Sequence, residues 1–248
     1  MTRPPAKDDN VIDLTRSDDV FILTMTEGEN RWNTTFVRAF AAALDEVERS
    51  TGPAALVTTS ASEKFFSNGL DLEWVSSSGE HAGGDRSVFG AEFMALMGRI
   101  ITLPIPTIVA INGHAFGAGF MTSLCHDVRY MRIDRGFICA NEMQLGMVIP
   151  PPELALFRHK LPAHTFFETV QLARRWGGPD ALTAGIVQGT VSIEELLPVA
   201  ITRARELAPL GANRAAYGGQ KESLFGQFSA LNHPHGAAHM LKNAPLFH

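Results

Sequence analysis

PTIVAINGHAFGAG, residues 106–119, is the stretch of this sequence that decides the fold. Its β-branched and apolar start predicts a buried strand over Thr107–Ile111, and the Asn-Gly pair that follows predicts a turn. Two glycines then open a helix that we expect over Ala118–Cys125. The first N–H groups of a helix have no partner within it, and the helix dipole adds positive charge there. A strand that runs through a glycine-rich turn into a helix therefore suits an anion site.

Three interpretations of Gly113–Gly119 are open at this point. The N–H groups at the helix start would hold a phosphate, a carboxylate or a developing oxyanion. A nucleotide-binding module that uses Gly117–Gly119 is an alternative, although the segment lacks the third glycine of the G-x-G-x-x-G pattern. The small residues also let a helix pack closely against a strand without any ligand.

Strands alternate with helices on both sides of this stretch, and helices alone follow the prolines at 150–152. This order predicts an α/β core with a helical C-terminal part. A hairpin is expected around the turn TRSDD, and a capping box over Ser192–Glu195 begins a helix that runs to about Leu207. The other expected strands and helices are Val11–Leu14, Val20–Met25, Thr34–Arg49, Ala54–Thr59, Ser87–Leu103, Val128–Ile133 and Gly136–Ala140. Residues 1–10 are expected to form a loose tail, FFSNGLD a loop, and Ser76–Gly84 a mobile linker.

The composition is that of a globular protein. Of 248 residues, 45% are hydrophobic and 19% are charged, and 21 basic against 26 acidic residues give a net charge of −5. That balance excludes a disordered or collagen-like chain and a nucleic-acid binder driven by basic charge. The length allows one large domain or two small ones. Two cysteines, Cys125 and Cys139, cannot build a disulfide framework and fit a reducing compartment.

No segment is expected to cross a membrane. Ile100–Cys125 contains no Asp, Glu, Lys or Arg, but two prolines break its start and Asn112–His114 lie in its middle. The first ten residues lack the apolar core of a signal peptide, and Leu246–His248 is no peroxisomal address. We therefore expect a soluble, cytoplasmic protein.

Two further features gain weight beside the glycine-rich helix start. Gly69 in FFSNGLD allows a backbone geometry that turns an N–H inward, so two loops would together supply the two donors of an oxyanion hole. Glu142 follows an apolar strand and precedes Met143, Leu145 and Met147. A carboxyl in such surroundings has a raised pKa, which suits a general acid or base. A surface turn and a solvated glutamate at a strand end are the alternatives.

Other chemistries find little support. Cys125, His126 and Asp127 are consecutive and point in different directions, so they cannot form a triad. Ser67 does not lie in a G-x-S-x-G elbow, which argues against a serine hydrolase. The nine histidines show no metal-ligand spacing, so we expect no metal site.

Three motifs in order, FFSNGLDL (65–72), PTIVAINGHAFGAG (106–119) and NEMQLGMVIP (141–150), resemble the crotonase superfamily, which includes enoyl-CoA hydratases and isomerases. The resemblance covers roughly residues 11–225. It implies an α/β fold, a spiral of ββα units with a C-terminal helical trimerisation region. On that basis residues 11–190 form an acyl-CoA-binding catalytic core and residues 191–248 a helical assembly segment of the same domain.

The resemblance also implies roles for residues at matching positions. The backbone N–H groups of Leu70 and Ala118 would hold the thioester oxygen, and Glu142 would be the catalytic carboxylate. The expected substrate-binding residues are Arg31, Lys64, Phe66, Ser67, Asn68, Gly69, Asp71 and Gly117, with Arg31 or Lys64 near the phosphates. Coenzyme A would be part of the substrate, with no separate cofactor, and the protein would form trimers or dimers of trimers.

The catalytic acids separate the branches of the superfamily. Hydratases have a second glutamate on the glycine-rich helix, at the position of Met121, whereas isomerases work with one. We therefore expect an enoyl-CoA delta isomerase that moves the double bond of a 3-enoyl-CoA to give the 2-trans isomer, with Glu142 alone taking the proton from C2 and returning it at C4. A hydratase, a thioester hydrolase, a decarboxylase and a non-catalytic acyl-CoA-binding protein are the alternatives.

Overall fold

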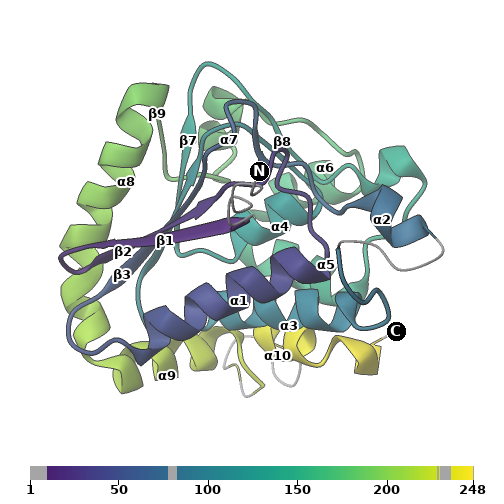
Figure 1. Ribbon diagram of the computed structural model, residues 1–248. Coiled ribbons are helices and arrows are strands. Elements are labelled where there is room, and N and C mark those ends of the chain that lie inside the picture. Colours follow the sequence, from purple (N-terminus) through teal and green to yellow (C-terminus); the bar gives the residue numbers. More distant parts are fainter. Residues whose placement is uncertain (1–9, 78–82, 228, 230–235, 248) are drawn as a thin grey trace, which may run out of the picture.

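Six strands form the larger of two sheets in the computed structural model, which describes residues 10–77, 83–227, 229 and 236–247 (Figure 1). The strand order is β1-β2-β3-β5-β7-β9, and every pair except β1–β2 is parallel. The bounds are β1 Ile12–Ser17, β2 Val20–Met25, β3 Ala55–Ser60, β5 Thr107–Ile111, β7 Val128–Arg132 and β9 Gly189–Val191. The predicted α/β class is confirmed, whereas the tail at residues 1–9 and the linker over 78–82 lie outside the described residues.

The predicted hairpin is present, but its turn is shorter than expected. Strand β1 continues to Ser17, which pairs with Val20, so only Asp18 and Asp19 connect the strands. Asp18 has a φ of 56°, a left-handed conformation that aspartate tolerates in tight turns. The turn predicted from TRSDD is therefore too long, because Thr15 and Arg16 pair with β2 and belong to the strand.

A second sheet has three strands and includes residues of two of the quoted motifs, FFSNGLDL and PTIVAINGHAFGAG. Its parallel order is β4 (Phe65–Ser67), β6 (His114–Phe116) and β8 (Ile138–Cys139). The expectation that FFSNGLD is wholly a loop is wrong, because its first three residues are β4. Strand β6 follows the Asn-Gly turn directly. Strands of two or three residues are too short to show a period-two pattern, and the short β9 was missed for the same reason.

Helices cover both faces of the larger sheet. Helix α8 (Ile193–Leu207) lies along one face, where Leu196, Ala200 and Ala204 meet buried side chains of β3 and β5. The helices α1 (Thr34–Arg49), α3 (Phe89–Ile101) and α4 (Ala118–Leu124) pack on the other side, in the main apolar cluster. Asn33 caps α1, since its side chain accepts a hydrogen bond from the Phe36 N–H. The predicted capping box of α8 is confirmed, because Ser192 Oγ accepts from the Glu195 N–H at 3.3 Å.

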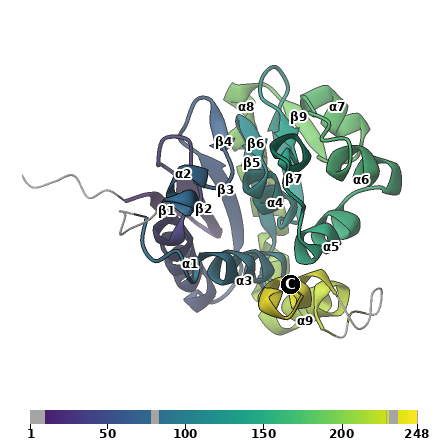
Figure 2. The ribbon, with the colours of Figure 1, turned by 90° about the vertical axis from the view of Figure 1, so that its right-hand side faces the viewer.

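The C-terminal helices pack onto the same core as the strands. Figure 2 shows α10 beside α3, with α5 next to it, in agreement with their contacts. A buried ion pair of 2.8 Å joins Lys221 of α9 to Asp127 at the start of β7. The remaining helices are α2 Leu72–Ser76, α5 Pro151–Lys160, α6 Ala163–Val170, α7 Gly178–Thr183, α9 Arg214–Phe225 and α10 Ala237–Lys242, with 3₁₀ turns at Glu142–Leu145, Ala208–Ala212 and Ala244–Phe247. That residues 191–248 assemble subunits stays a prediction.

Close backbone packing brings α4 against β4. A Cβ atom on Gly119 would lie 2.6 Å from the carbonyl oxygen of Ser67 and 2.8 Å from its Cβ. Ser67 is fully buried, and its hydroxyl donates to the Asn30 carbonyl, so it has no room to retreat. Only glycine at 119 therefore lets the helix start this close to the strand.

We expect Gly119→Ala to lower the free energy of unfolding by about 1–3 kcal/mol, because the added methyl overpacks a backbone contact that cannot give way. Gly219→Ala is the matched control. Gly219 is an exposed helical glycine with nothing within 4 Å of its Cβ position, so the change should stabilise by about 0.4–1 kcal/mol. Urea unfolding measures both. Equal stability of the two variants would contradict the role given to the Gly119 contact.

Candidate active site

A largely apolar cavity of about 470 Å³ opens where the second sheet, α3, α4 and the start of α5 meet. Its walls come from segments far apart in the chain, which the two sheets bring together. The lining residues are Arg31, Asn68, Gly69, Leu70, Leu72, Phe89, Gly90, Phe93, Met94, Gly117, Ala118, Asn141, Glu142, Leu145, Met147, Val148, Pro150 and Glu153. Seven of the eleven residues predicted for the site are among them, including Leu70, Ala118 and Glu142.

Two unpaired backbone N–H groups lie close together at one wall. Gly69 has a φ of +84°, and a Cβ atom built on it would lie 2.9 Å from the Phe116 carbonyl oxygen and 3.7 Å from the Ala118 nitrogen. The loop after β4 therefore touches the first residue of α4. Within the described residues, neither the Leu70 N–H nor the Ala118 N–H donates to a protein acceptor. Both are free to donate to an oxygen in the cavity.

The carboxyl of Glu142 lies against the same helix start. Gly117, the residue before α4, has a φ of +47°, and a Cβ atom there would lie 3.0 Å from Glu142 Oε1. A side chain at 117 would be strained by that backbone conformation and would press on the carboxyl. The Glu142 carboxyl thus lies against Gly117, the residue that precedes Ala118 and its free N–H.

Burial sets the protonation of Glu142. The residue begins a 3₁₀ turn, Glu142–Leu145, and its Oε2 atom is buried with no hydrogen-bond partner in the described structure. Loss of water raises its pKa above the usual value for glutamate, and its own backbone N–H acts in the opposite direction. A carboxyl with a raised pKa is suited to act as a general acid or base.

Glu153 is a second carboxyl in the cavity and was not foreseen. It lies in the first turn of α5, where a glutamate commonly faces solvent, yet only 6% of it is exposed. Four residues further along the same helix face, Phe157 packs edge-on against Phe120 of α4 with ring centroids 5.2 Å apart. That contact fixes the face of α5 that meets α4. In the sequence, Glu153 stands three and four residues before the apolar Leu156 and Phe157, so it lies on the same helix face as they do. That spacing does not say which other helix covers this face.

Burial and the neighbouring Glu142 together raise the pKa of Glu153 to about 8. Its Oε1 atom is buried and accepts no hydrogen bond from the described residues. Two carboxylates in one cavity repel each other, so each disfavours the charged form of the other. Glu153 is the more deeply buried of the two, so burial favours its protonated form more strongly.

The far end of the cavity is apolar and partly open. Helix α3 contributes Phe89, Phe93 and Met94, none of which was predicted for the site. The segment after Glu142 contributes Leu145 and Val148, whose side chains are 52% and 86% exposed. Exposed large apolar residues beside a cavity are typical of a surface that receives an apolar ligand or a partner.

Arg31 and Asn68 lie at the polar end, but neither is a free donor. Arg31 forms an ion pair of 2.7 Å with Glu29, and Asn68 donates to the same carboxylate at 2.7 Å. These hydrogen bonds lower the pKa of Glu29. The positive charge of Arg31 is therefore largely balanced by the carboxylate of Glu29.

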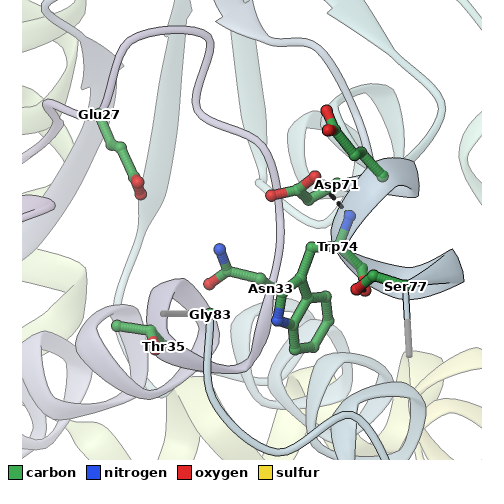
Figure 3. A pocket seen from close by; sticks show the side chains of 8 residues that line it. Glu27, Asn33, Thr35, Asp71, Trp74, Ser77 and Gly83 are labelled. Carbon is green, nitrogen blue, oxygen red and sulfur yellow. Dashed lines mark hydrogen bonds between the residues drawn. The ribbon is translucent and has the colours of Figure 1, made fainter. Parts of the chain in front are cut away.

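Four predicted substrate-binding residues do not line the cavity. Phe66 and Ser67 are fully buried in the core, and Lys64 lies over the ring of Phe65 at 4.8 Å. Asp71 caps α2 by accepting from the Trp74 N–H and lines a separate polar hollow of about 400 Å³ (Figure 3). Burial of β4 on both faces explains the error for Phe66 and Ser67, since all three residues of the strand are buried while the following loop lines the cavity.

Other candidate chemistries are absent from this cavity. Met121 is buried in the core and does not line it. Burial raises the pKa of the Cys125 thiol to about 12 and that of Cys139 to about 11, so both stay protonated and unreactive. Among the described residues, no group of three or more His, Cys, Asp or Glu side chains is placed to bind a metal ion.

Two neighbouring N–H groups without partners, a carboxyl of raised pKa and an apolar cavity on this fold define a protein of the crotonase class. A family model described as enoyl-CoA hydratase/isomerase matches residues 15–239. The chain belongs to the enoyl-CoA hydratase/isomerase family.

Relatives and solved structures agree with that placement. The chain is 29% identical over 224 residues to enoyl-CoA delta isomerase 2, peroxisomal, of Arabidopsis thaliana, covering 88% of this chain and 93% of the relative. It is 32% identical over 216 residues to enoyl-CoA delta isomerase 1, peroxisomal, of the same plant, covering 85% and 88%. A probable enoyl-CoA hydratase of Mycobacterium tuberculosis H37Rv superposes with a TM-score of 0.79 at 27% identity, covering 94% and 92%.

The described part of the chain contains no helix that is both long enough and apolar enough to span a bilayer. Both Arabidopsis relatives are peroxisomal by name, so the cytoplasmic location stays a prediction.

Glu153 makes the stability of the protein depend on pH. Its pKa is raised from 4.5 to about 8 on folding, so its protonated form favours the folded state, and this contribution is full at low pH and lost as the pH rises to about 8. We expect urea unfolding to show that Glu153→Gln, which cannot ionise, becomes more stable relative to wild type between pH 5 and pH 8.

Glu46→Gln is the matched control, because Glu46 is exposed on α1 and away from the cavity. Its stability relative to wild type should stay constant over the same pH range. A constant difference for Glu153→Gln as well would contradict the burial of an ionisable carboxyl at this position.

Proposed function

We propose that this protein is an enoyl-CoA delta isomerase that converts a 3-enoyl-CoA into the 2-trans-enoyl-CoA. The observation that carries the proposal is the position of the Glu142 carboxyl against Gly117, one residue from the unpaired N–H of Ala118. A thioester whose oxygen accepts from the Leu70 and Ala118 N–H groups would bring its C2 carbon next to that carboxyl.

The chemistry needs a base and an oxyanion site in one cavity. Glu142 removes a proton from C2, and the electron pair moves onto the thioester oxygen to form a dienolate. Donors aimed at that oxygen stabilise the charge where it develops, and removing one such donor typically costs about 100- to 1,000-fold in rate. A carboxylic acid of the cavity then gives up a proton to C4, the double bond forms between C2 and C3, and the thioester carbonyl is restored.

The rest of the cavity suits the remaining parts of this substrate. Phe89, Phe93 and Met94 offer an apolar wall to the acyl chain. Arg31 and Asn68 are at the end where the coenzyme A part would leave the cavity, with Lys64 exposed nearby in the chain. Coenzyme A enters as part of the substrate, and the mechanism requires no separate cofactor. The names of the Arabidopsis relatives support the delta isomerase activity.

Hydration of a 2-enoyl-CoA is the second candidate. The solved relative from Mycobacterium tuberculosis carries that activity in its name, and the cavity here holds two carboxyls, the number a hydratase uses. Product analysis separates the two reactions. A hydratase forms 3-hydroxyacyl-CoA from a 2-enoyl-CoA, whereas the proposed isomerase yields a 2-enoyl-CoA from a 3-enoyl-CoA.

Glu142→Gln should lower the turnover of 3-hexenoyl-CoA by at least about 100-fold, because an amide cannot accept the C2 proton. Binding of the substrate should stay within a few-fold of wild type, since the shape of the side chain is kept and the two backbone donors are untouched. Steady-state kinetics of the purified enzyme and calorimetric titration with a saturated acyl-CoA measure the two effects.

Glu46→Gln is again the control, because it makes the same chemical change on an exposed surface. It should isomerise like wild type. Near wild-type turnover by Glu142→Gln would refute the proposed function, and loss of acyl-CoA binding together with turnover would show that Glu142 supports the fold of the cavity instead.

A further inference from the structure

The carboxyl of Glu153 has no structural work in the fold that would explain its burial. It accepts no hydrogen bond at Oε1, and among the described residues the only charge that shifts its pKa is that of Glu142. A buried polar atom without a partner costs about 1–3 kcal/mol, and a buried charge costs more. A chain that keeps such a group in a cavity, when leucine or glutamine would fit the same space, retains it for a ligand or a reaction.

The second carboxyl faces the same space as the first. Glu153 and Glu142 both line the cavity, and each has one buried oxygen with no partner in the described structure. They come from different elements, the 3₁₀ turn after β8 and the first turn of α5. An enoyl group that rests its thioester oxygen on the Leu70 and Ala118 N–H groups would share the cavity with both carboxyls.

We propose that Glu153 is a second proton-transferring carboxyl, which delivers the proton to C4 while Glu142 takes the proton from C2. This inference rests on the proposed isomerase function and divides its proton transfer between two groups. A single carboxyl must reach two carbons that lie on opposite sides of C3, whereas two carboxyls each reach one.

The proton count balances over a turnover. At the start Glu142 is a carboxylate and Glu153 a carboxylic acid. The C2–H bond breaks and its proton goes to Glu142, then the Glu153 O–H bond breaks and its proton forms the new bond at C4. After product release, Glu142 gives its proton to water and Glu153 takes a proton from water, which restores the starting state.

The decisive measurement separates the two half-reactions. Exchange of the C2 protons of 3-hexenoyl-CoA with D₂O reports the step at Glu142, and formation of 2-hexenoyl-CoA reports the step at C4. We expect Glu153→Gln to keep C2 exchange within a few-fold of wild type while isomerisation falls by at least about 100-fold. Glu142→Gln should lose both, and Glu46→Gln neither.

A variant-free measurement keeps the inference testable should Glu153→Gln fold poorly. Wild-type enzyme turns over 3-hexenoyl-CoA carrying deuterium at C2 in ordinary water. Two carboxyls should give a product whose C4 position takes its new hydrogen from the solvent-derived proton on Glu153. Transfer of the C2 deuterium to C4 in most product molecules would mean that one group makes both transfers.

Two other outcomes would overturn the inference. Isomerisation by Glu153→Gln at a near wild-type rate would show that C4 receives its proton from elsewhere. An equal loss of C2 exchange and isomerisation would show that Glu153 acts only through Glu142. Either result leaves the isomerase function standing as long as Glu142→Gln is inactive, whereas an active Glu142→Gln, or a wild type that isomerises no 3-enoyl-CoA, rejects the proposed function itself.

Discussion

Close contact between the loop after β4 and the start of α4 is the constraint on which the site depends. Gly119 lets the helix lie on Ser67, and Gly69 lets the loop lie on Phe116, with no room for a Cβ atom at either position. The two contacts fix two backbone N–H groups side by side, without using any side chain. Such donors cost no reorganisation when charge develops, because the fold already holds them in place. The packing interpretation of these glycines is thus confirmed by the close contacts, and the same contacts leave two N–H groups without partners, while the binding of an anion there stays a prediction.

The acids of the cavity follow from the same arrangement. Gly117 leaves space in which the Glu142 carboxyl sits, and the packing of Phe157 on Phe120 turns Glu153 toward the same helix start. Neither carboxyl is solvated well enough to ionise freely, and each disfavours the charge of the other. A largely apolar cavity therefore favours the protonated form of both carboxyls and of Glu153 above all.

Long elements were predictable from the sequence, whereas among the short strands only β8 was, within the expected strand Gly136–Ala140. Thr34–Arg49 and Thr107–Ile111 have the predicted bounds, because each presents a sustained periodic or apolar pattern with a clear start and stop. The strands of the second sheet contain two or three residues each and show no period, yet they decide which side chains face the cavity. For that reason Phe66 and Ser67 were assigned to the site although they are buried in the core. Backbone donors and Glu142 were placed by motif, whereas Glu153 depends on the packing of α5 on α4, which no local pattern encodes.

The position of the second acid bears on how the two branches of this family are told apart. Met121 at the position of the second hydratase glutamate argues for a single-carboxyl isomerase only if no other element supplies an acid. Here α5 does supply one, since Glu153 in its first turn lines the cavity. A hydratase needs both carboxyls on one water, while an isomerase needs access to two carbons of the chain. The reaction is therefore decided by where each carboxyl lies relative to the N–H pair at Leu70 and Ala118, and the number of glutamates alone does not distinguish the two.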